Sequence, residues 1–402
     1  MKFGGTSVAD PEKIQRAAER AIAERRRGRG VVVVVSAPGE MTDELLALAG
    51  RVAEAPDERE TDQLISTGEQ VGIALFAMAC KSRGQDAVSL TGAQAGIEAH
   101  GAHTRAQIRR IRPRKILREL SRGRIVTVAG FQGLTDDDDV ATLGRGGSDL
   151  TAVALASALK AGSCEVFSDV KGVYTADPRI VFEARKLARI TFEEMLELAG
   201  AGAQVMQARS MEVAERFGVP IHVRSAFHPQ IGTWIVPKED KMLERAYVSA
   251  LALDKNEVRL SIADVPDRPG VAAEVLGALA AQDIPVDMII QSAPSHRGVN
   301  GISFMTPKEF AGKAQAALQK EARKLKARVD LHDQVAKVSA VGTGFRHHPG
   351  IAATMFETLA ANKINIHMIV ASDLRISCVV DAKHGEAALK ALHKAYKLGR
   401  KS

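Results

Sequence analysis

Cysteine and aromatic residues are scarce in this chain of 402 residues, which has three cysteines, an aromatic content of 4% and a single tryptophan. Three widely spaced cysteines with no Cys-x-x-Cys pair argue against a disulfide framework and favour a reducing compartment. With so few aromatic side chains, we expect the core to consist mainly of Ala, Val, Leu and Ile. The length exceeds that of one ordinary core and predicts two or three domains.

Long apolar runs and strong charge are also absent. No stretch approaches the roughly 18 apolar residues of a membrane helix, and the N-terminus has no apolar signal core, so we expect a cytoplasmic protein that is neither exported nor membrane-bound. The net charge is only +7 and no nucleic-acid-binding motif occurs, so we expect no nucleic-acid partner. His100 and His103, and the adjacent His347 and His348, could suggest a metal site. They lack Cys or carboxylate partners at ligand spacing, so we predict no protein-bound metal and expect solvated loop histidines instead.

The first 237 residues alternate apolar runs with helical stretches. Runs of β-branched residues are typical of strands that are buried on both faces of a parallel sheet. We predict strands at 31–35, 125–129, 165–168 and 219–223, and helices at 11–27, 43–54, 62–82, 148–161 and 191–217. Asp10 followed by Pro11 is a typical helix start. The alternation predicts a layered α/β domain over residues 1–237, with a mainly parallel sheet.

The remainder of the chain contains an internal repeat. Pro269-Gly270-Val271-Ala272-Ala273 recurs as Pro349-Gly350-Ile351-Ala352-Ala353, and later apolar positions repeat at the same offset of 80 residues. Each copy has the order strand, helix, strand, strand, helix, strand. We therefore predict two βαββαβ modules, at 250–327 and 328–402, and the strand near 247–253 is a candidate for completing the second. Two small sheets side by side would offer an interface suited to a small ligand.

Three glycine loops precede predicted helices, namely Lys2-Phe3-Gly4-Gly5, Ser36-Ala37-Pro38-Gly39 and Gly144-Arg145-Gly146-Gly147-Ser148. Glycines let backbone N–H groups approach a phosphate closely, and a helix N-terminus favours an anion. Arg145 could bind a carboxylate through two parallel hydrogen bonds. An ordinary tight turn is the alternative explanation of each loop taken alone. No Gly-x-x-x-x-Gly-Lys-Ser/Thr sequence occurs, so a P-loop nucleotide site is excluded.

Five motifs together resemble those of the aspartate kinase family, in the family's order and spacing, and with the repeat the resemblance covers essentially the whole chain. They are Lys2-Phe3-Gly4-Gly5-Thr6-Ser7-Val8, Ser66-Thr67-Gly68-Glu69, Ala129-Gly130-Phe131-Gln132-Gly133, Leu143-Gly144-Arg145-Gly146-Gly147-Ser148-Asp149 and Val173-Tyr174-Thr175-Ala176-Asp177-Pro178-Arg179. The resemblance implies an amino-acid-kinase three-layer sandwich followed by two ferredoxin-like ACT modules. It also implies transfer of a phosphoryl group from ATP, with Mg²⁺, to the side-chain carboxylate of L-aspartate, the first step of lysine, threonine and methionine biosynthesis.

The resemblance assigns roles to individual residues. The catalytic residues would be Lys2, Ser36 and Asp169. ATP would contact Lys2, Phe3, Gly4, Gly5, Ser168, Asp169, Tyr174, Arg179, Gln204 and Val205. Aspartate would contact Thr42, Glu69, Arg145, Gly146, Gly147 and Ser148, with Glu69 at its ammonium and Arg145 at its α-carboxylate. A lysine or threonine effector would contact Asp267, Gly270, Ala272, Gln291, Asn365, Ile366 and Ser372.

The sequence departs from the family pattern at two places. Gln204 stands where the family has a lysine that would face the nucleotide phosphates, and Val370-Ala371 stand where it has two hydroxyl side chains. The first departure leaves open a catalytically silent, amino-acid-sensing subunit as an alternative to an active kinase, and the second predicts weakened feedback. A kinase acting on another carboxylate, such as glutamate, is a third possibility. We expect a homodimer formed through the ACT modules, or a hetero-oligomer.

Overall fold

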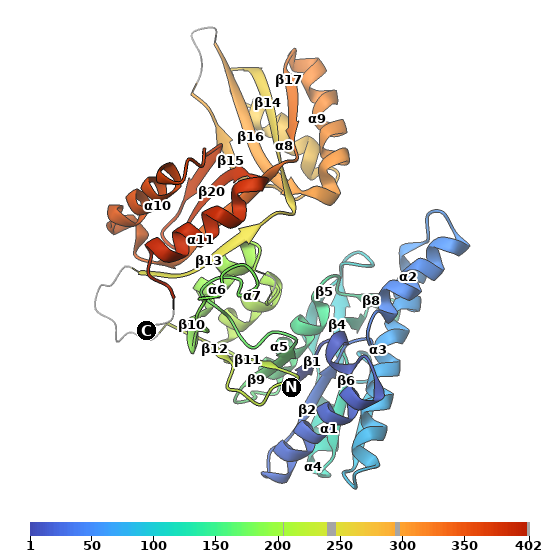
Figure 1. The fold of residues 1–402 in the computed structure, drawn as a ribbon. Coiled ribbons are helices and arrows are strands. Elements are labelled where there is room, and N and C mark those ends of the chain that lie inside the picture. Colours follow the sequence, from blue (N-terminus) through green and yellow to red (C-terminus); the bar gives the residue numbers. More distant parts are fainter. Residues whose placement is uncertain (204, 239–246, 294–297, 400–402) are drawn as a thin grey trace. The chain divides into compact units, whose positions relative to one another are not determined.

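The computed structural model describes residues 1–203, 205–238, 247–293 and 298–399 (Figure 1). Contacts divide the chain into two compact units. Unit 1 comprises Met1–Val173, Lys186–Ala199 and Gln204–Asp240, and unit 2 comprises Tyr174–Arg185, Gly200–Ala203 and Lys241–Ser402. The domain boundary expected at residue 237 stays a prediction. The division by contacts differs from a single cut at that residue, because it follows three segments of the chain in each unit. Two short segments that precede this boundary pack with the C-terminal repeat.

Unit 1 is built on an eight-stranded sheet with the order β10-β12-β11-β9-β1-β2-β6-β3, in which only β11 and β12 are antiparallel neighbours. Its strands are β1 (Lys2–Phe3), β2 (Val32–Val35), β3 (Ala87–Leu90), β6 (Ile125–Ala129), β9 (Cys164–Ser168), β10 (Arg189–Thr191), β11 (Ile221–Ser225) and β12 (Thr233–Val236). A smaller sheet has the order β5-β4-β7-β8 and comprises β4 (Ile97–His100), β5 (Gln107–Ile111), β7 (Gln132–Leu134) and β8 (Val140–Thr142). The predicted mainly parallel sheet is confirmed.

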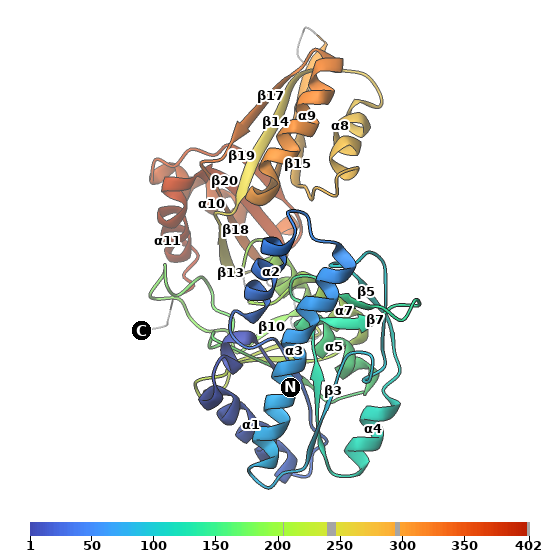
Figure 2. The ribbon, with the colours of Figure 1, turned by 90° about the vertical axis from the view of Figure 1, so that its right-hand side faces the viewer.

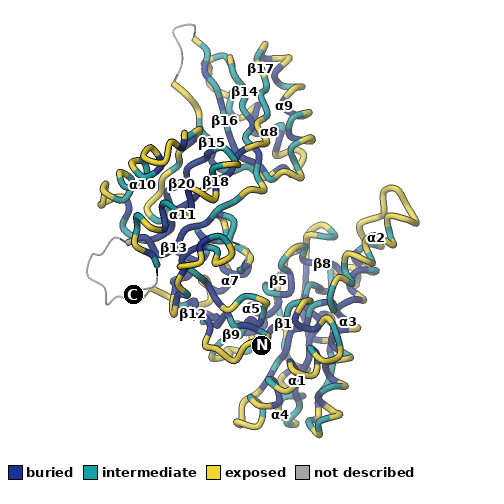
Figure 3. Tube along the Cα trace, in the orientation of Figure 1, coloured by how far each residue is buried: buried dark blue, intermediate teal, exposed yellow. Residues whose placement is uncertain are grey.

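Helices cover both faces of the large sheet (Figures 1 and 2). The helices of unit 1 are α1 (Pro11–Arg26), α2 (Met41–Val52), α3 (Glu58–Lys81), α4 (Arg114–Ser121), α5 (Gly147–Ala158), α6 (Phe192–Gly200) and α7 (Ala208–Phe217), with a short 3₁₀ helix η1 at Gly5–Val8. Helices α1 and α3 pack on Phe3, Val33 and Val35, whereas α4 and α5 lie beside Val34, which points to the other face. The unit is therefore a three-layer α/β sandwich, as predicted. Helix α2 has no buried residue, as Figure 3 shows.

Local sequence signals explain where helix α1 begins. The side chain of Asp10 accepts a hydrogen bond from the Lys13 backbone N–H at 2.8 Å, and Pro11 occupies the first turn. Ile14, Ala18 and Ile22 recur at helical spacing and are buried against the sheet. The predicted helix start is confirmed.

The single helix predicted over 191–217 is wrong. The structure has two helices here, α6 and α7, and α6 ends at Gly200. Gly202 follows with φ of +101°, a backbone conformation that side-chain-bearing residues rarely adopt and that cannot continue an α-helix. A Cβ atom at Gly202 would lie 2.7 Å from the Cβ of Asp254, so close packing also requires glycine at this position.

Unit 2 contains the two predicted modules. Module 1 has β14 (Glu257–Pro266), α8 (Val271–Ala280), β15 (Asp287–Gln291), β16 (Val299–Pro307), α9 (Ala311–Leu325) and β17 (Arg328–His332). Module 2 has β18 (Val335–Thr343), α10 (Pro349–Ala361), β19 (Met368–Ala371), β20 (Arg375–Asp381) and α11 (Gly385–Ala395). Short 3₁₀ helices lie at Lys308–Phe310, Phe345–His347 and Ala382–His384. The fourth strand of module 2 is β13 (Tyr247–Asp254), which precedes module 1 in the chain and pairs antiparallel with β18.

The two modules pack together through equivalent positions of the repeat. Met288 and Met368 occupy the same place in the two copies, and both lie in one buried cluster between the modules. Lys337 and Glu257 are likewise equivalent, and the fully buried Lys337 ammonium lies 3.0 Å from a carboxylate oxygen of Glu257 and 3.0 Å from one of Asp287. The repeat thus places residues of opposite charge at equivalent positions of the two modules, and these residues meet at the junction.

Candidate active site

The central strands of unit 1 place three loops at one edge of the large sheet. Strand β1 is parallel to both of its neighbours, and Phe3 lies opposite Val35 of β2 and Phe167 of β9. All three strands therefore end at the same edge, so Gly4, Ser36 and Ser168 follow them side by side. Open α/β sheets bind ligands at the carboxyl ends of their strands.

The first two loops are in close contact. The backbone N–H of Gly39 donates a hydrogen bond to the carbonyl oxygen of Gly5 at 3.1 Å. A Cβ atom on Gly5 would lie 2.8 Å from the carbonyl oxygen of Ala37 and 2.9 Å from that of Gly39, closer than real Cβ atoms come to neighbouring atoms. Glycine is thus required here for the approach of two backbones, in addition to any contact with a phosphate.

Lys2 is held in an ion pair at this edge. Its ammonium lies 2.6 Å from a carboxylate oxygen of Asp149, and both side chains are nearly buried. Asp149 stands in the first turn of α5, where the helix dipole favours a negative charge. Asp149 belongs to a motif of the predicted family, but no role was predicted for it from the sequence. The sequence did contain a signal for such a role, because Asp149 is an acidic residue that directly follows a glycine loop in the first turn of a predicted helix.

Glu69 is a buried carboxylate with one unused oxygen. It lies on α3 and is 3% exposed, and one of its oxygens accepts a hydrogen bond from the Ala37 backbone N–H at 3.2 Å. Its other oxygen has no hydrogen-bond partner among the described residues. Burial raises the pKa of Glu69 to about 7, although the Ala37 N–H acts in the opposite direction. A cationic ligand group would satisfy both the charge and the free oxygen.

The loop that carries Arg145 depends on glycine. Gly144 and Gly146 have φ of +73° and +75°, in the left-handed region that favours glycine. Gly147 and Ser148 are buried where α5 begins, whereas Arg145 is exposed and has no partner among the described residues. Its guanidinium is therefore available for an anionic ligand.

A second buried carboxylate, Asp62, fixes the strand that leads into this loop, and sequence reasoning missed it. It is fully buried and accepts hydrogen bonds from the backbone N–H groups of Thr104 and Thr142, both at 2.9 Å. His103 Nδ1 lies 2.9 Å from the same carboxylate. The expectation that His103 is a solvated loop histidine is therefore wrong, because its ring contacts the buried carboxylate of Asp62.

The predicted nucleotide residues are divided between the two units. Ser168, Asp169 and Val205 lie in unit 1, with Ser168 and Asp169 at the carboxyl end of β9. The side chain of Phe3 is fully buried and stacks on Phe167 with ring centroids 4.7 Å apart, so only the Phe3 backbone can contact a ligand. Gln204 lies outside the described residues.

Tyr174 and Arg179 belong to unit 2. Tyr174 packs against the core of module 2, and Arg179 forms an ion pair with Asp177 at 2.7 Å. Thr42, assigned to aspartate, lies in the first turn of α2 and is half-buried.

Comparison with known proteins identifies the family. The amino acid kinase family matches residues 1–225, and the ACT domain matches residues 260–322 and 338–396. An aspartate kinase of Pseudomonas putida is 46% identical over 399 residues, which are 99% of this chain and 97% of that protein. The chain belongs to the aspartate kinase family.

Further aspartate kinases match this chain over nearly its whole length. An aspartokinase of Mycobacterium bovis is 44% identical over 403 residues, covering 99% of this kinase and 96% of the relative. The structure of E. coli aspartokinase III in complex with aspartate and ADP superposes with a TM-score of 0.83 at 27% identity, covering 98% of both chains. Since the kinases match along their whole length, the chain is an aspartate-phosphorylating enzyme with a nucleotide substrate. The alternative of a purely regulatory subunit is not supported.

The predicted effector residues of the kinase lie on its ACT modules. Asp267 is exposed and accepts a hydrogen bond from the Asn300 side-chain amide at 3.1 Å, and Gly270 has φ of +95° just before α8. Gln291 and Asn365 are exposed. Among the described residues, no hydrogen bond or ion pair joins these side chains to one another or to Ala272, Ile366 or Ser372, and their effector role stays a prediction.

The hydroxyl of Ser372 is already engaged within module 2. It accepts hydrogen bonds from the backbone N–H groups of Leu374 and Arg375 in the turn that follows β19. An effector would have to compete with this turn for the hydroxyl.

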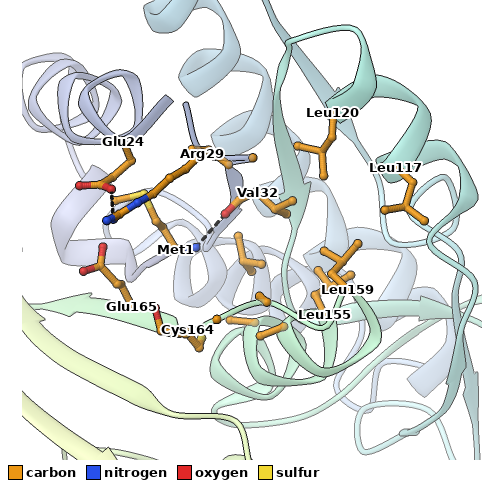
Figure 4. A pocket seen from close by; sticks show the side chains of 18 of the residues that line it. Met1, Glu24, Arg29, Val32, Leu117, Leu120, Leu155, Leu159, Cys164 and Glu165 are labelled. Atoms are coloured by element: carbon orange, nitrogen blue, oxygen red, sulfur yellow. Dashed lines mark hydrogen bonds and ion pairs between the residues drawn. The ribbon is translucent and has the colours of Figure 1, made fainter. Parts of the chain in front are cut away.

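A cavity of about 710 Å³ lies at the other edge of the large sheet. Figure 4 shows that Met1, Val32 and Cys164 line it, and the N-terminal ammonium donates a hydrogen bond to the Val32 carbonyl oxygen at 2.7 Å. These residues stand at the amino ends of β1, β2 and β9, so the cavity is separate from the site described above. Its walls combine apolar side chains, Leu155 among them, with the charged side chains of Glu24, Arg29 and Glu165.

Within the described residues, no three His, Cys, Asp or Glu side chains gather as metal ligands. In the same part of the chain, no helix has the length and apolar character needed to cross a bilayer.

Proposed function

We propose that the enzyme transfers the γ-phosphoryl group of ATP to the side-chain carboxylate of L-aspartate, giving 4-phospho-L-aspartate and ADP. The reaction would take place in unit 1 beside Lys2, at the carboxyl ends of β1, β2 and β9. The observation that carries this proposal is the Lys2–Asp149 ion pair at the point where two glycine loops meet. A fixed cation beside backbone N–H groups is suited to the negative charge of a phosphoryl group in transfer.

ATP fits these residues. Lys2 supplies the positive charge, Gly4 and Gly5 bring backbone to the surface at the N-terminal end of η1, and Asp149 keeps the lysine in place. Ser36 and Asp169 flank this point from the neighbouring strand ends. Phosphoryl transfer requires positioning and charge neutralisation more than covalent help from the protein, and this arrangement provides both.

Mg²⁺ would accompany the nucleotide and neutralise part of its phosphate charge. Magnesium in such sites is bound chiefly by phosphate oxygens and water, with one or two carboxylates. The lack of a ligand cluster among the described residues is compatible with this mode of binding. The exposed carboxylate of Asp169 is the candidate protein ligand.

Glu69 and Arg145 would orient aspartate by its two non-reacting groups. The free, buried oxygen of Glu69 suits the α-ammonium, and the exposed guanidinium of Arg145 suits the α-carboxylate. With both ends held, the side-chain carboxylate would point toward the phosphoryl group. A coupled assay of ADP release with aspartate, with glutamate and without acceptor tests this function. ADP release no faster with aspartate than without acceptor would contradict it.

The pKa of Glu69 predicts how activity depends on pH. Below pH 7 the buried carboxyl group is mostly protonated and cannot pair with an ammonium, so kcat/KM for aspartate should fall by up to about tenfold per pH unit as the pH drops below about 7. Glu69→Gln should raise the KM for aspartate and remove this acidic limb. A limb that persists unchanged in Glu69→Gln would show that another group, on the enzyme or a substrate, titrates there.

Arg145→Ala should raise the KM for aspartate by roughly tenfold or more while kcat changes little, because the guanidinium binds a part of the substrate that does not react. Arg145→Lys should restore only part of the affinity, since an ammonium cannot form the two-point contact. Arg26→Ala, which removes another exposed arginine at the end of α1, is the control. An unchanged KM in Arg145→Ala would contradict the proposed orientation of the substrate.

The ACT modules are proposed to bind an amino-acid effector, lysine or threonine, and to pair between two chains. Support comes from a relative, E. coli aspartokinase III, whose structure was determined in complex with lysine and aspartate. Val370 and Ala371 offer no hydroxyl groups to such an effector. We therefore propose weaker feedback than in relatives that have hydroxyl side chains at these positions.

A further inference from the structure

The segment that carries Tyr174 and Arg179, both predicted to contact the nucleotide, packs with the second ACT module. The segment Tyr174–Arg185 leaves unit 1 after Val173, packs in unit 2 and returns to unit 1 at Lys186. Apolar side chains of this segment and of α11 share the buried core of module 2, among them Ala176, Val181, Ala184, Leu389 and Leu392. The backbone of Ala184 also forms an antiparallel bridge with Gly399, after α11.

Thr175 is the polar centre of this attachment. It is fully buried, and its hydroxyl oxygen lies 3.0 Å from His393 Nε2, 3.3 Å from the carbonyl oxygen of Leu398 and 2.9 Å from the backbone nitrogen of Arg185, whose N–H donates to it. Its backbone carbonyl oxygen accepts a hydrogen bond from the Leu251 N–H at 2.8 Å. Thr175, which directly follows Tyr174, is thus hydrogen-bonded to β13, to α11 and to the segment that follows α11.

His393 is the side chain that reaches Thr175 from the ACT module. It stands in the last turn of α11 and is 3% exposed. Burial lowers the pKa of His393, with Glu183 acting in the opposite direction, so the ring is neutral near pH 7 and has one N–H donor and one acceptor nitrogen. A neutral ring matches the single hydroxyl that it faces. Loss of either group would leave the other buried without this hydrogen bond.

We propose that His393 is a positioning residue for the nucleotide. Through Thr175 it fixes the backbone between Tyr174 and Arg179, and so sets the affinity of the enzyme for ATP and ADP. The inference rests on the proposed function and on the predicted contacts of Tyr174 and Arg179 with the nucleotide. It assigns to the second ACT module a direct structural role in nucleotide binding, separate from any effector site.

The test is the KM for ATP and the dissociation constant of ADP, the latter from calorimetry, measured on the full chain. His393→Ala should raise both by about tenfold, while kcat and the KM for aspartate stay within about twofold. His393→Gln, whose amide can reach the same hydroxyl, should restore most of the affinity. If His393→Ala fails to fold, Thr175→Val removes the hydroxyl with little change of shape and should have the same effect. A double mutant of Thr175 and His393 should be no worse than Thr175→Val alone, because that substitution already removes the hydroxyl that His393 contacts.

Ser377→Ala is the matched control. Ser377 is fully buried on β20 of the same module and shares a 2.8 Å hydrogen bond with Ser339, away from the loop. It should lower the melting temperature about as much as His393→Ala but leave nucleotide affinity unchanged. Equal loss of nucleotide affinity in Ser377→Ala, or unchanged affinity in a folded His393→Ala, would overturn the inference.

Arg179→Ala separates this inference from the proposed function. If Arg179→Ala weakens ADP binding and His393→Ala does not, only the positioning role fails. If Arg179→Ala leaves ADP binding intact while aspartate-dependent ADP release persists, the predicted nucleotide role of Tyr174 and Arg179 fails together with the inference, and the proposed function stands.

Discussion

Replacement of Lys2 by methionine is expected to lower kcat by at least about a hundredfold. Lys2 is the cation fixed where the glycine loops meet, and the stabilisation of charge on the transferred group is usually the largest single contribution to such catalysis. Methionine keeps the length and apolar stem of the side chain, so β1 should remain in place between β2 and β9. Steady-state assays with both substrates saturating measure the effect on kcat.

The control for this experiment is Lys13→Met. Lys13 also forms a lysine–aspartate pair, at 2.8 Å from Asp10, but it lies on the surface of α1, and its removal should leave kcat within about twofold. A kcat for Lys2→Met within tenfold of the unsubstituted enzyme would contradict the catalytic role of Lys2. Asp149→Asn should lower kcat less than Lys2→Met, because the cation stays but loses its fixed position.

Lys337→Ala is expected to destabilise unit 2 by about 3–5 kcal/mol, because it leaves the largely buried carboxylate of Glu257 without its cation and removes the nearer of two cations from the partly exposed Asp287. The Lys337 side chain is 0% exposed and lies between Glu257 and Asp287 at the junction of the two modules. Burial raises the pKa of Glu257 even beside the lysine, because the loss of hydration outweighs the attraction of the ammonium. Urea unfolding followed by a probe in unit 2 measures the loss.

Two comparisons sharpen this second experiment. Lys255→Ala removes an ion pair with Glu386 in which both side chains are about half-exposed, and it should cost less than about 1 kcal/mol. Combining Lys337→Met with Glu257→Gln and Asp287→Asn removes all three charges and should recover most of the stability. A single Lys337→Ala variant as stable as Lys255→Ala would show that water reaches the junction.

The sequence by itself determined the elements of this protein and its family. The β-branched run that became β2, the Asp10–Pro11 start of α1 and the repeat that became two ACT modules are local patterns. They can be read because helix caps and alternating burial depend on near neighbours in the chain. The ordered motifs likewise identified the family and the enzyme, which comparison with aspartate kinases confirmed. The prediction failed locally over 191–217, where the positive φ of Gly202 separates two helices.

Only the tertiary structure decided which distant residues meet. It paired Lys2 with Asp149 and completed module 2 with β13, a strand from before module 1. It also left one buried oxygen of Glu69 without a partner in the part of the chain that the structure describes. It also placed Thr175 against His393, 218 residues further along the chain. Pairings of this kind follow from sheet order and from the exclusion of water, which raises the pKa of Glu69 and keeps the ring of His393 neutral. Both are properties of the packed chain, and no local pattern of residues carries them.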